Sequence, residues 1–272
     1  MNLHAIQCYS VRQGQCGFTL VEISIVLVII GLLVGGILAG SELIRASEMR
    51  SIVSDKERFL VAVHGFQAKY SAILGDFANA QEIWGSAAIC TSSQTTIATC
   101  NGDGDGSIER GVGSGNVGNE LFLFWKHLSN DGFIGGNFVG IKDGSTSYAT
   151  TANNAPSGKI TSSLWYVENL DWAAGLSWAW SYRYGNSFQF GLPKANQDPW
   201  ASVLTSAEMF ALDNKIDDGK PGTVRLIADR SLVGCVVKAD GVTAAASTDY
   251  QTAIYKTSST DKQCYLLFIK VF

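Results

Sequence analysis

The chain has 272 residues and a formal net charge of −4, and 46% of its residues are apolar. That length is typical of one large domain or two small ones, and the apolar content is enough for a sizeable core. The few basic residues form no block of the kind that marks nucleic-acid-binding proteins, so we expect no nucleic-acid partner.

The first predicted element is an apolar run over residues 18–40, in which the polar side chains are Thr19, Glu22 and Ser24. As a helix, a run of about 23 residues with a rise of ~1.5 Å each would be roughly 35 Å long, enough to cross a membrane. An acid in such a segment costs about 2.5–3.5 kcal/mol unless it has a partner. The run itself contains no cation, so Glu22 needs a positive group from elsewhere.

The residues around this acid form a recognisable motif, Gly17-Phe18-Thr19-Leu20-Val21-Glu22, followed by the apolar run. The motif resembles the class III signal of type IV pilins and type II secretion pseudopilins. The resemblance implies that residues 1–17 are a prepilin leader, that a peptidase cuts after Gly17, and that the new N-terminus at Phe18 is methylated.

The same resemblance implies where the chain acts and with what. The subunit would span the inner membrane once and then join a periplasmic or extracellular filament. Its partners would be copies of itself, other pilins or pseudopilins, the prepilin peptidase and an inner-membrane assembly platform. In the filament, Glu22 would be neutralised by the Phe18 ammonium of the adjacent subunit, which would set the axial register.

The apolar run continues into an amphipathic segment over residues 41–74, which we expect to be the second half of the same helix. Its apolar residues recur at a spacing of three to four and include Ile52, Val53, Phe59, Leu60, Val63 and Tyr70. Residues 75–272 are then predicted to form a globular domain. The predicted fold class is α+β, with the long helix packed on an antiparallel sheet as in pilins.

The globular domain begins with a loop rich in Gly, Ser, Thr, Asn and Asp over residues 78–118. Apolar periodicity predicts a helix over Asn119 to Asn130. A second helix is predicted over Thr205–Asn214, with Thr205 and Glu208 spaced as a capping box.

Strands are predicted between and after these helices from their β-branched and aromatic content. Gly185-Asn186 is expected to join two of them as a tight hairpin, with the alternating aromatic side chains of the first strand covering one face. The predicted strands are Leu164–Val167, Leu176–Tyr184, Ser187–Leu192, Val224–Ala228, Leu232–Lys238 and Cys264–Val271.

Four cysteines follow the leader, and an even number on one side of a membrane predicts two disulfides in an oxidising compartment. Sequence alone allows three pairings. We favour Cys90 with Cys100 and Cys235 with Cys264, because each pair is local within its own region.

The segment from Asn101 to Ile108 resembles the first eight positions of an EF-hand calcium loop. Oxygen-bearing side chains alternate along it at Asn101, Asp103, Asp105 and Ser107. The twelfth position is Val112, so the last ligand would come from Glu109 or Glu120. The alternative is a solvated turn rich in Gly and Asp.

A second oxygen-rich turn contains Asp213, Asp217 and Asp218. Asp213 and Asp217 would lie on one helix face, and pseudopilins commonly hold calcium in a loop beside their sheet. Calcium is therefore the expected cofactor at either turn, or as one ion shared by both. The alternative is a capped turn whose charges are neutralised by neighbouring lysines.

No catalytic constellation is evident in the sequence: it has no HExxH or P-loop motif, and its histidines are interpreted as surface or packing residues. We therefore expect a structural subunit and not an enzyme. The length suggests a minor pilin or pseudopilin, and the retained Glu22 argues against a place at the filament tip. The alternatives are a pilus-associated adhesin, a DNA-uptake binding module, or a membrane-tethered periplasmic enzyme.

Overall fold

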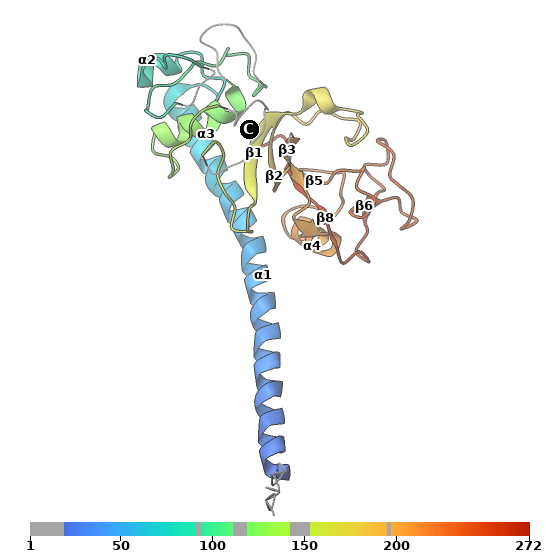
Figure 1. Cartoon of the computed structure of the whole chain (residues 1–272). Coiled ribbons are helices and arrows are strands. Elements are labelled where there is room, and N and C mark those ends of the chain that lie inside the picture. Colours follow the sequence, from blue (N-terminus) through green and yellow to red (C-terminus); the bar gives the residue numbers. More distant parts are fainter. Residues whose placement is uncertain (1–18, 91–93, 111–118, 142–152, 195–196) are drawn as a thin grey trace, which may run out of the picture. The chain divides into compact units, whose positions relative to one another are not determined.

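We describe the chain from a computed structural model, which covers residues 19–90, 94–110, 119–141, 153–194 and 197–272. The chain divides into two compact units, Met1–Ser47 and Glu48–Phe272. Helix α1, Leu20–Tyr70, contributes to both (Figure 1). This helix is long and apolar enough to cross a membrane.

In the first unit, the described part of α1 exposes nearly all of its side chains. Leu20, Leu32 and Ile37 are each at least 70% exposed. An apolar surface of this extent is unstable in water, so it calls for lipid or for the helices of other subunits. The first unit thus has the apolar helix predicted for residues 18–40.

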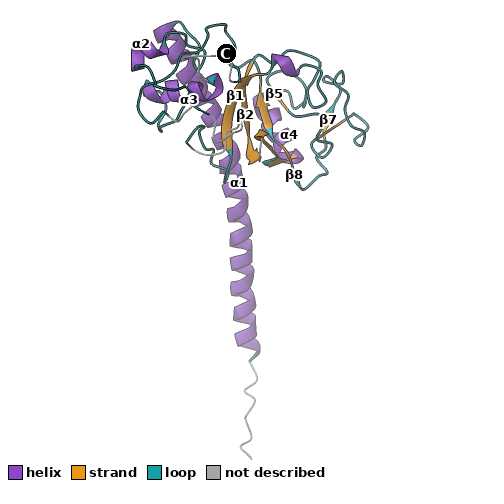
Figure 2. Cartoon of the chain, turned by 45° about the horizontal axis from the view of Figure 1, so that its top comes forward, coloured by secondary structure: helices purple, strands orange, loops and turns teal. Residues whose placement is uncertain are grey.

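The second unit is built on an antiparallel sheet in the order β1-β2-β9-β5, with β3 pairing to β2 (Figure 2). Two further two-stranded pairs, β4 with β8 and β6 with β7, lie outside that sheet. The strands are β1 Leu164–Asn169, β2 Asn186–Lys194, β3 Gln197–Ala201, β4 Leu204–Thr205, β5 Leu226–Ile227, β6 Val236–Val237, β7 Ile254–Tyr255, β8 Lys262–Cys264 and β9 Leu266–Phe268. This confirms the predicted α+β class.

The helices of this unit are the end of α1, α2 (Ala80–Trp84), α3 (Glu120–Asn130), the 3₁₀ turn η1 (Asp171–Ala173) and α4 (Ser206–Ile216). Helix α4 begins with the predicted capping box: Glu208 N–H donates to Thr205 Oγ1 at 3.2 Å, and Thr205 N–H donates to the Glu208 carboxylate at 2.8 Å.

An aromatic cluster joins α1, α3 and the sheet. The Phe59 ring of α1 lies 5.0 Å from Trp125 of α3, 5.4 Å from Trp165 of β1 and 6.1 Å from Phe188 of β2, measured between ring centroids. All four side chains are buried, so large apolar areas leave water at one point. The second unit depends on this cluster to hold its helices against the sheet.

Helix α3 also buries a lysine, Lys126. The Lys126 ammonium donates to the carbonyl oxygens of Thr96 at 2.7 Å, Gln94 at 3.2 Å and Phe138 at 3.4 Å. Burial lowers the pKa of Lys126 to about 8. These bonds tie the described part of the segment before α3, at Gln94 and Thr96, to Phe138 after the helix.

The predicted strand Leu176–Tyr184 and its hairpin at Gly185-Asn186 are wrong. The segment folds into turns, and Asn186 already belongs to β2, where it pairs with Asn169 of β1. The Arg230 guanidinium donates to the carbonyl oxygens of Leu176 and Ala179 at 2.8 and 2.7 Å. Side chains thus take up the backbone groups that a strand ladder would have needed.

We predict that Phe59→Ala lowers the free energy of unfolding of the second unit by about 3–5 kcal/mol, because it leaves a cavity among three aromatic rings. Val61→Ala is the matched control: Val61 is 71% exposed on the same helix, and its loss should cost under about 0.5 kcal/mol. Denaturant titration of the full chain in micelles, followed by tryptophan fluorescence, measures both. Equal effects would contradict the packing described here.

Candidate functional site

The start of α1 is held by a capping box. The backbone N–H and the hydroxyl of Thr19 both donate to one Glu22 carboxylate oxygen at 2.8 Å, and Glu22 N–H donates to Thr19 Oγ1 at 3.2 Å. Such a reciprocal pair satisfies amides that a helix start leaves without partners. The sequence analysis missed this role, although the T-x-x-E spacing signals it.

The capping box does not neutralise Glu22. Both donors are neutral groups, so neither supplies a positive charge to the carboxylate within the most apolar part of the chain. The expected cleavage and methylation positions, Gly17 and Phe18, lie outside the described residues. The proposed ion pair between Glu22 and a second subunit therefore stays a prediction.

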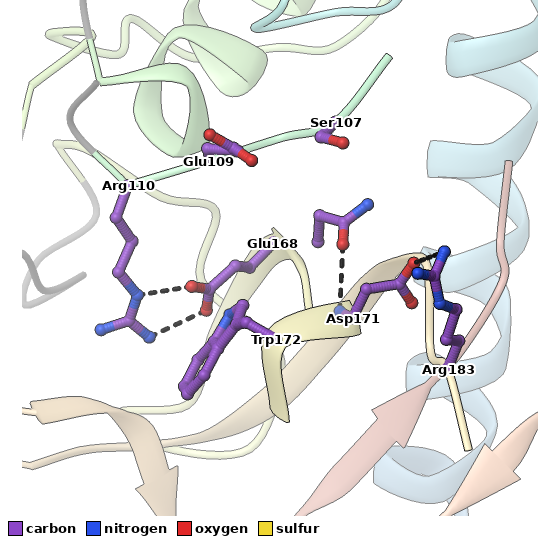
Figure 3. Close-up of a pocket in the computed structure, with 8 residues that line it drawn as sticks. Ser107, Glu109, Arg110, Glu168, Asp171, Trp172 and Arg183 are labelled. Atoms are coloured by element: carbon purple, nitrogen blue, oxygen red, sulfur yellow. Dashed lines mark hydrogen bonds and ion pairs between the residues drawn. The ribbon is translucent and has the colours of Figure 1, made fainter. Parts of the chain in front are cut away.

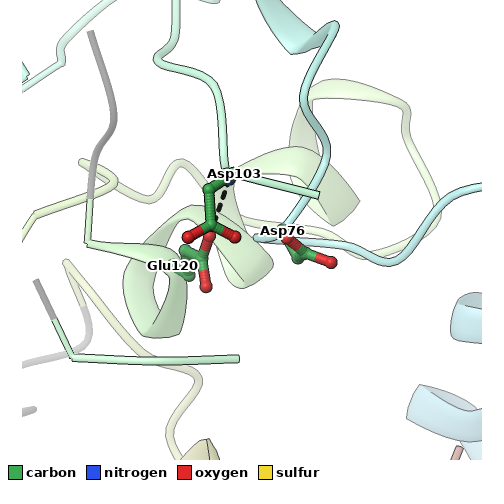
Figure 4. A group of neighbouring side chains, drawn as sticks. All are labelled: Asp76, Asp103 and Glu120. Carbon is green, nitrogen blue, oxygen red and sulfur yellow. Dashed lines mark hydrogen bonds between the residues drawn. The ribbon is translucent and has the colours of Figure 1, made fainter. Parts of the chain in front are cut away.

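Three carboxylates meet in the second unit: Asp76, Asp103 and Glu120, which offer oxygen atoms within 4.8 Å of one another (Figure 4). Asp76 follows α1, Asp103 lies in the glycine-rich loop and Glu120 begins α3. Asp76 and Glu120 are 3% and 2% exposed, whereas Asp103 is exposed. Within the described residues, none of the three forms an ion pair with Lys or Arg.

Asp76 is the residue that the sequence analysis did not include among the ligands. Its carboxylate accepts backbone N–H groups from Gly104 at 2.5 Å, Gly106 at 2.8 Å and Asp105 at 3.1 Å. Gly104 and Gly106 have φ angles of 81° and 95°, which glycine adopts without strain. Alternating glycines thus let the loop wrap its amides around a buried anion.

The position of Asp76 is fixed through His127 of α3. The N–H of Gly75 donates to His127 Nδ1 at 3.2 Å, and His127 Nε2 lies 3.2 Å from the Thr99 hydroxyl. Burial lowers the pKa of His127 to about 3, so the ring is neutral and can accept from the Gly75 amide. His127 is thus a packing histidine, as predicted.

Glu120 accepts the N–H groups of Asp103 and Glu109, each at 3.0 Å, and so closes the loop from its other side. Burial raises the pKa of Asp76 to about 6 and that of Glu120 to about 7, against the opposing effect of these amides. A cluster of buried acids with raised pKa values is destabilising when fully ionised, unless a cation shares the charge.

Two other predicted ligands of the EF-hand-like loop, Asn101 and Asp105, accept hydrogen bonds from backbone groups, and Ser107 lines a separate cavity. Asn101 accepts the N–H of Gln81 at 2.9 Å, and Asp105 accepts the N–H of Ser107 at 2.8 Å. The structure therefore brings together Asp103 and Glu120 of the predicted set and adds Asp76. This arrangement differs from a loop that points alternate side chains at one centre.

The second acidic turn is arranged differently. Asp213 is fully buried, accepts the Tyr255 hydroxyl at 2.7 Å, and has a pKa raised to about 7 by burial. Asp217 accepts the N–H groups of Arg225 and Leu226, while Asp218 accepts from the backbone of Lys220 and the hydroxyl of Thr223. These carboxylates hold the turn to the start of β5, whether or not they also bind an ion.

Two disulfides brace the loops around these acidic segments. Cys90 is bonded to Cys100, with Cα atoms 5.8 Å apart, and Cys235 to Cys264, with Cα atoms 5.3 Å apart. These are the two local pairs that the sequence favoured. Cys100 directly precedes Asn101, so the first bond anchors the loop that surrounds Asp76.

We predict that the stabilising contribution of Glu120 falls as pH rises. Its pKa is higher in the folded state, about 7, than the ordinary 4.5, so the folded state is favoured while the carboxyl is protonated. The wild-type free energy of unfolding relative to that of Glu120→Gln should fall by about 2 kcal/mol between about pH 5 and pH 8.

This difference is measured by denaturant titration in the presence of a chelator. Comparing the two chains cancels the opposing contribution of His127, whose low folded-state pKa costs stability as pH falls below 6.5. A difference that stays constant with pH would contradict the raised pKa of Glu120.

Comparison with known proteins gives one match. Residues 12–38 match the family model described as the prokaryotic N-terminal methylation motif. No curated protein and no solved structure matches the chain. The matched residues include Gly17, Phe18 and Glu22 and lead into α1. The chain therefore carries a class III prepilin signal on an apolar helix, which supports a protein of the type IV pilin or pseudopilin kind.

Proposed function

We propose that the chain is a structural subunit, and a minor one, of a type IV pilus or type II secretion pseudopilus. The observation that carries this proposal is the methylation motif at residues 12–38, placed at the start of a helix whose apolar side chains are exposed. A soluble enzyme has no use for an exposed apolar helix, whereas a filament subunit uses one for two purposes. It holds the subunit in the membrane and then packs against its neighbours.

The assembly step follows from the chemistry of the leader. Cleavage after Gly17 releases an ammonium on Phe18, beside an acid that the helix has no cation to neutralise. Within one straight helix, an N-terminal ammonium and the side chain of Glu22 are poorly placed to meet. A second subunit, shifted along the filament axis, brings its ammonium to this carboxylate, and the pair fixes the shift between neighbours.

The capping box gives Glu22 two roles that can be separated. One is local, because the carboxylate accepts the amide and hydroxyl of Thr19. The other is the charge that attracts a neighbouring ammonium. A glutamine keeps the acceptor that a capping box requires but loses the charge.

We predict that Glu22→Gln reduces the amount of filament by at least about tenfold, because it leaves the neighbour's ammonium without a counter-charge in apolar surroundings. Glu22→Ala should do the same, whereas Thr19→Ala should keep most of the assembly, because the charge remains. Filaments are sheared from cells and quantified, and mass spectrometry of the whole chain checks that each variant is still cleaved after Gly17.

Two outcomes would contradict this proposal, the first for the ion pair of Glu22 and the second for the subunit as a whole. If the glutamine variant assembles normally while the alanine variant does not, the role of Glu22 is capping and not ion pairing. If native chains retain residues 1–17, the leader is not removed and the subunit proposal fails as a whole.

We also propose that calcium stabilises the globular unit at the cluster of Asp76, Asp103 and Glu120. Hard carboxylate oxygens suit calcium, and an ion here would offset the repulsion between two buried acids and a third beside them. Backbone amides already hold Asp76 and Glu120 in place, so little reorganisation is needed. Asp213, Asp217 and Asp218 remain a second candidate for the same ion.

We predict that calcium at about 100 times its Kd stabilises the chain by about 2.7 kcal/mol at pH 8, since the ion binds only the folded state. Glu120→Gln should abolish the shift. The matched control is Asp105→Asn, since the Asp105 carboxylate accepts an amide of its own loop and should not be needed. Asp213→Asn tests the second turn.

Thermal unfolding of the full chain with and without calcium measures these shifts, and terbium luminescence reports binding directly. The effect should be much smaller near pH 5, where Asp76 and Glu120 are mostly protonated. If calcium raises the unfolding temperature of the wild type and of Glu120→Gln equally, the ion does not bind at the cluster of Asp76, Asp103 and Glu120. If it shifts neither, the calcium proposal is wrong.

A further inference from the structure

The second unit contains a cavity of about 490 Å³ that is distinct from the group of Asp76, Asp103 and Glu120 (Figure 3). Its walls come from the loop at residues 107–110, the end of β1, the turn η1 and the side chain of Arg183. Its volume lies in the range of small-ligand sites. The backbone N–H of Glu109 donates to Glu120 of the acidic cluster, but the side chains that line the cavity are not among the three carboxylates of the calcium proposal.

One wall of the cavity is an exposed tryptophan. Trp172 of η1 is 52% exposed, although most tryptophans of this unit are buried. Its ring lies 6.2 Å from the ring of Trp178 and 5.6 Å from the guanidinium of Arg110. The Arg110 guanidinium lies over one side of the indole, so the part of the ring that is left open to solvent is the platform on which a flat apolar surface can stack.

The polar groups of the cavity are held in fixed positions. The Arg110 guanidinium donates to both oxygens of Glu168 at 2.5 and 2.8 Å, and the Glu168 side chain is only 1% exposed. Asp171 accepts the N–H of Gly185 at 2.7 Å, and its own N–H donates to Asn169 Oδ1 at 3.0 Å. Planar groups fixed in this way can bind pairs of hydroxyls without first losing conformational freedom.

Charge narrows the class of ligand. Arg110 is paired with Glu168, and Arg183 lies 3.7 Å from Asp171, so the two cations already have counter-charges. Glu109 adds one more carboxylate on the opposite wall. The cavity therefore offers many hydrogen-bonding groups but little net charge, which selects against phosphate, sulfate and other strongly anionic ligands.

A neutral sugar ring has the matching chemistry. One face of a pyranose presents C–H groups that stack on an indole, and its rim presents hydroxyls that both donate and accept. We propose that this cavity binds a neutral pyranose unit of a glycan, stacked on Trp172 and hydrogen-bonded by Glu109, Asp171 and Arg183. This adds a ligand-binding activity to the structural role proposed above.

The test uses the full-length chain in micelles of a detergent without a sugar head group. The probes are methyl β-galactoside, methyl β-glucoside and N-acetylglucosamine at about 10 mM, because single sugars are expected to bind with Kd near about 1 mM. Saturation-transfer-difference NMR should show transfer to the ring C–H protons of at least one probe. Trp172→Ala should weaken that binding by at least about tenfold, and Trp172→Tyr by less.

One control variant and one further variant of the site guard against indirect effects. The control, Phe210→Ala, removes another exposed aromatic side chain, on α4, and should bind as the wild type does. The site variant, Arg183→Ala, removes the guanidinium donors of a side chain that is 83% exposed, and should weaken binding without unfolding the chain. Near-ultraviolet circular dichroism verifies that each variant is folded.

The proposal is overturned if none of the three sugars shows transfer, or if Trp172→Ala and Phe210→Ala bind them equally well. It is also overturned if the cavity binds N-acetylneuraminate or a Gly-Lys-Gly peptide but no neutral sugar, since the ligand would then be charged. Because binding is measured on the isolated chain, failed filament assembly would leave this result unchanged.

Discussion

Two hydrogen bonds from Thr19 hold the Glu22 carboxylate at the first turn of α1, and both come from neutral groups. Thr19 thus fixes the position of the acid without supplying a cation, at the start of a helix whose side chains in the first unit are exposed. A membrane tolerates such a group only at a cost, and a bundle of helices removes the cost only if it supplies a cation. In the proposed filament, the helix would be the means of assembly, and the globular unit would be the part that the filament displays.

The globular unit stabilises long irregular loops by several independent means. An aromatic cluster around Phe59 joins helices to the sheet, while the ammonium of Lys126 binds three loop carbonyls. The carboxylate of Asp76 gathers the amides of the glycine-rich loop. Lys126 and Asp76 satisfy backbone groups that short strands cannot, whereas the aromatic cluster contributes apolar packing. Loops fixed in this way are also where the acidic cluster and the cavity beside Trp172 are found.

Sequence patterns predicted the elements whose signal is local. The apolar helix, the capping box of α4 and the α+β class follow from periodicity and spacing. The prediction for Leu176–Tyr184 was wrong because its alternating aromatic residues resemble the pattern of a strand. In the structure, Arg230, which is distant in the sequence, donates to carbonyl oxygens of this segment.

Asp76 was missed as a partner of Asp103 and Glu120 for a related reason. It lies 27 residues before Asp103, and only the fold brings them together. The motif around Asp103 predicted an acidic site, but the acids that gather there come from three separate segments. The cavity beside Trp172 likewise combines a loop, a strand end and a turn that no single stretch of sequence reveals.

In a fibre under tension, the disulfides would limit how far the globular unit can be stretched. The bond between Cys235 and Cys264 closes a segment with a sequence separation of 29, and the bond between Cys90 and Cys100 one with a separation of 10. A fully stretched chain spans ~3.3–3.6 Å per residue. Without the disulfide, the longer segment would therefore extend by roughly 100 Å under tension. Because the disulfide closes this segment, a force applied to the ends of the domain cannot extend it.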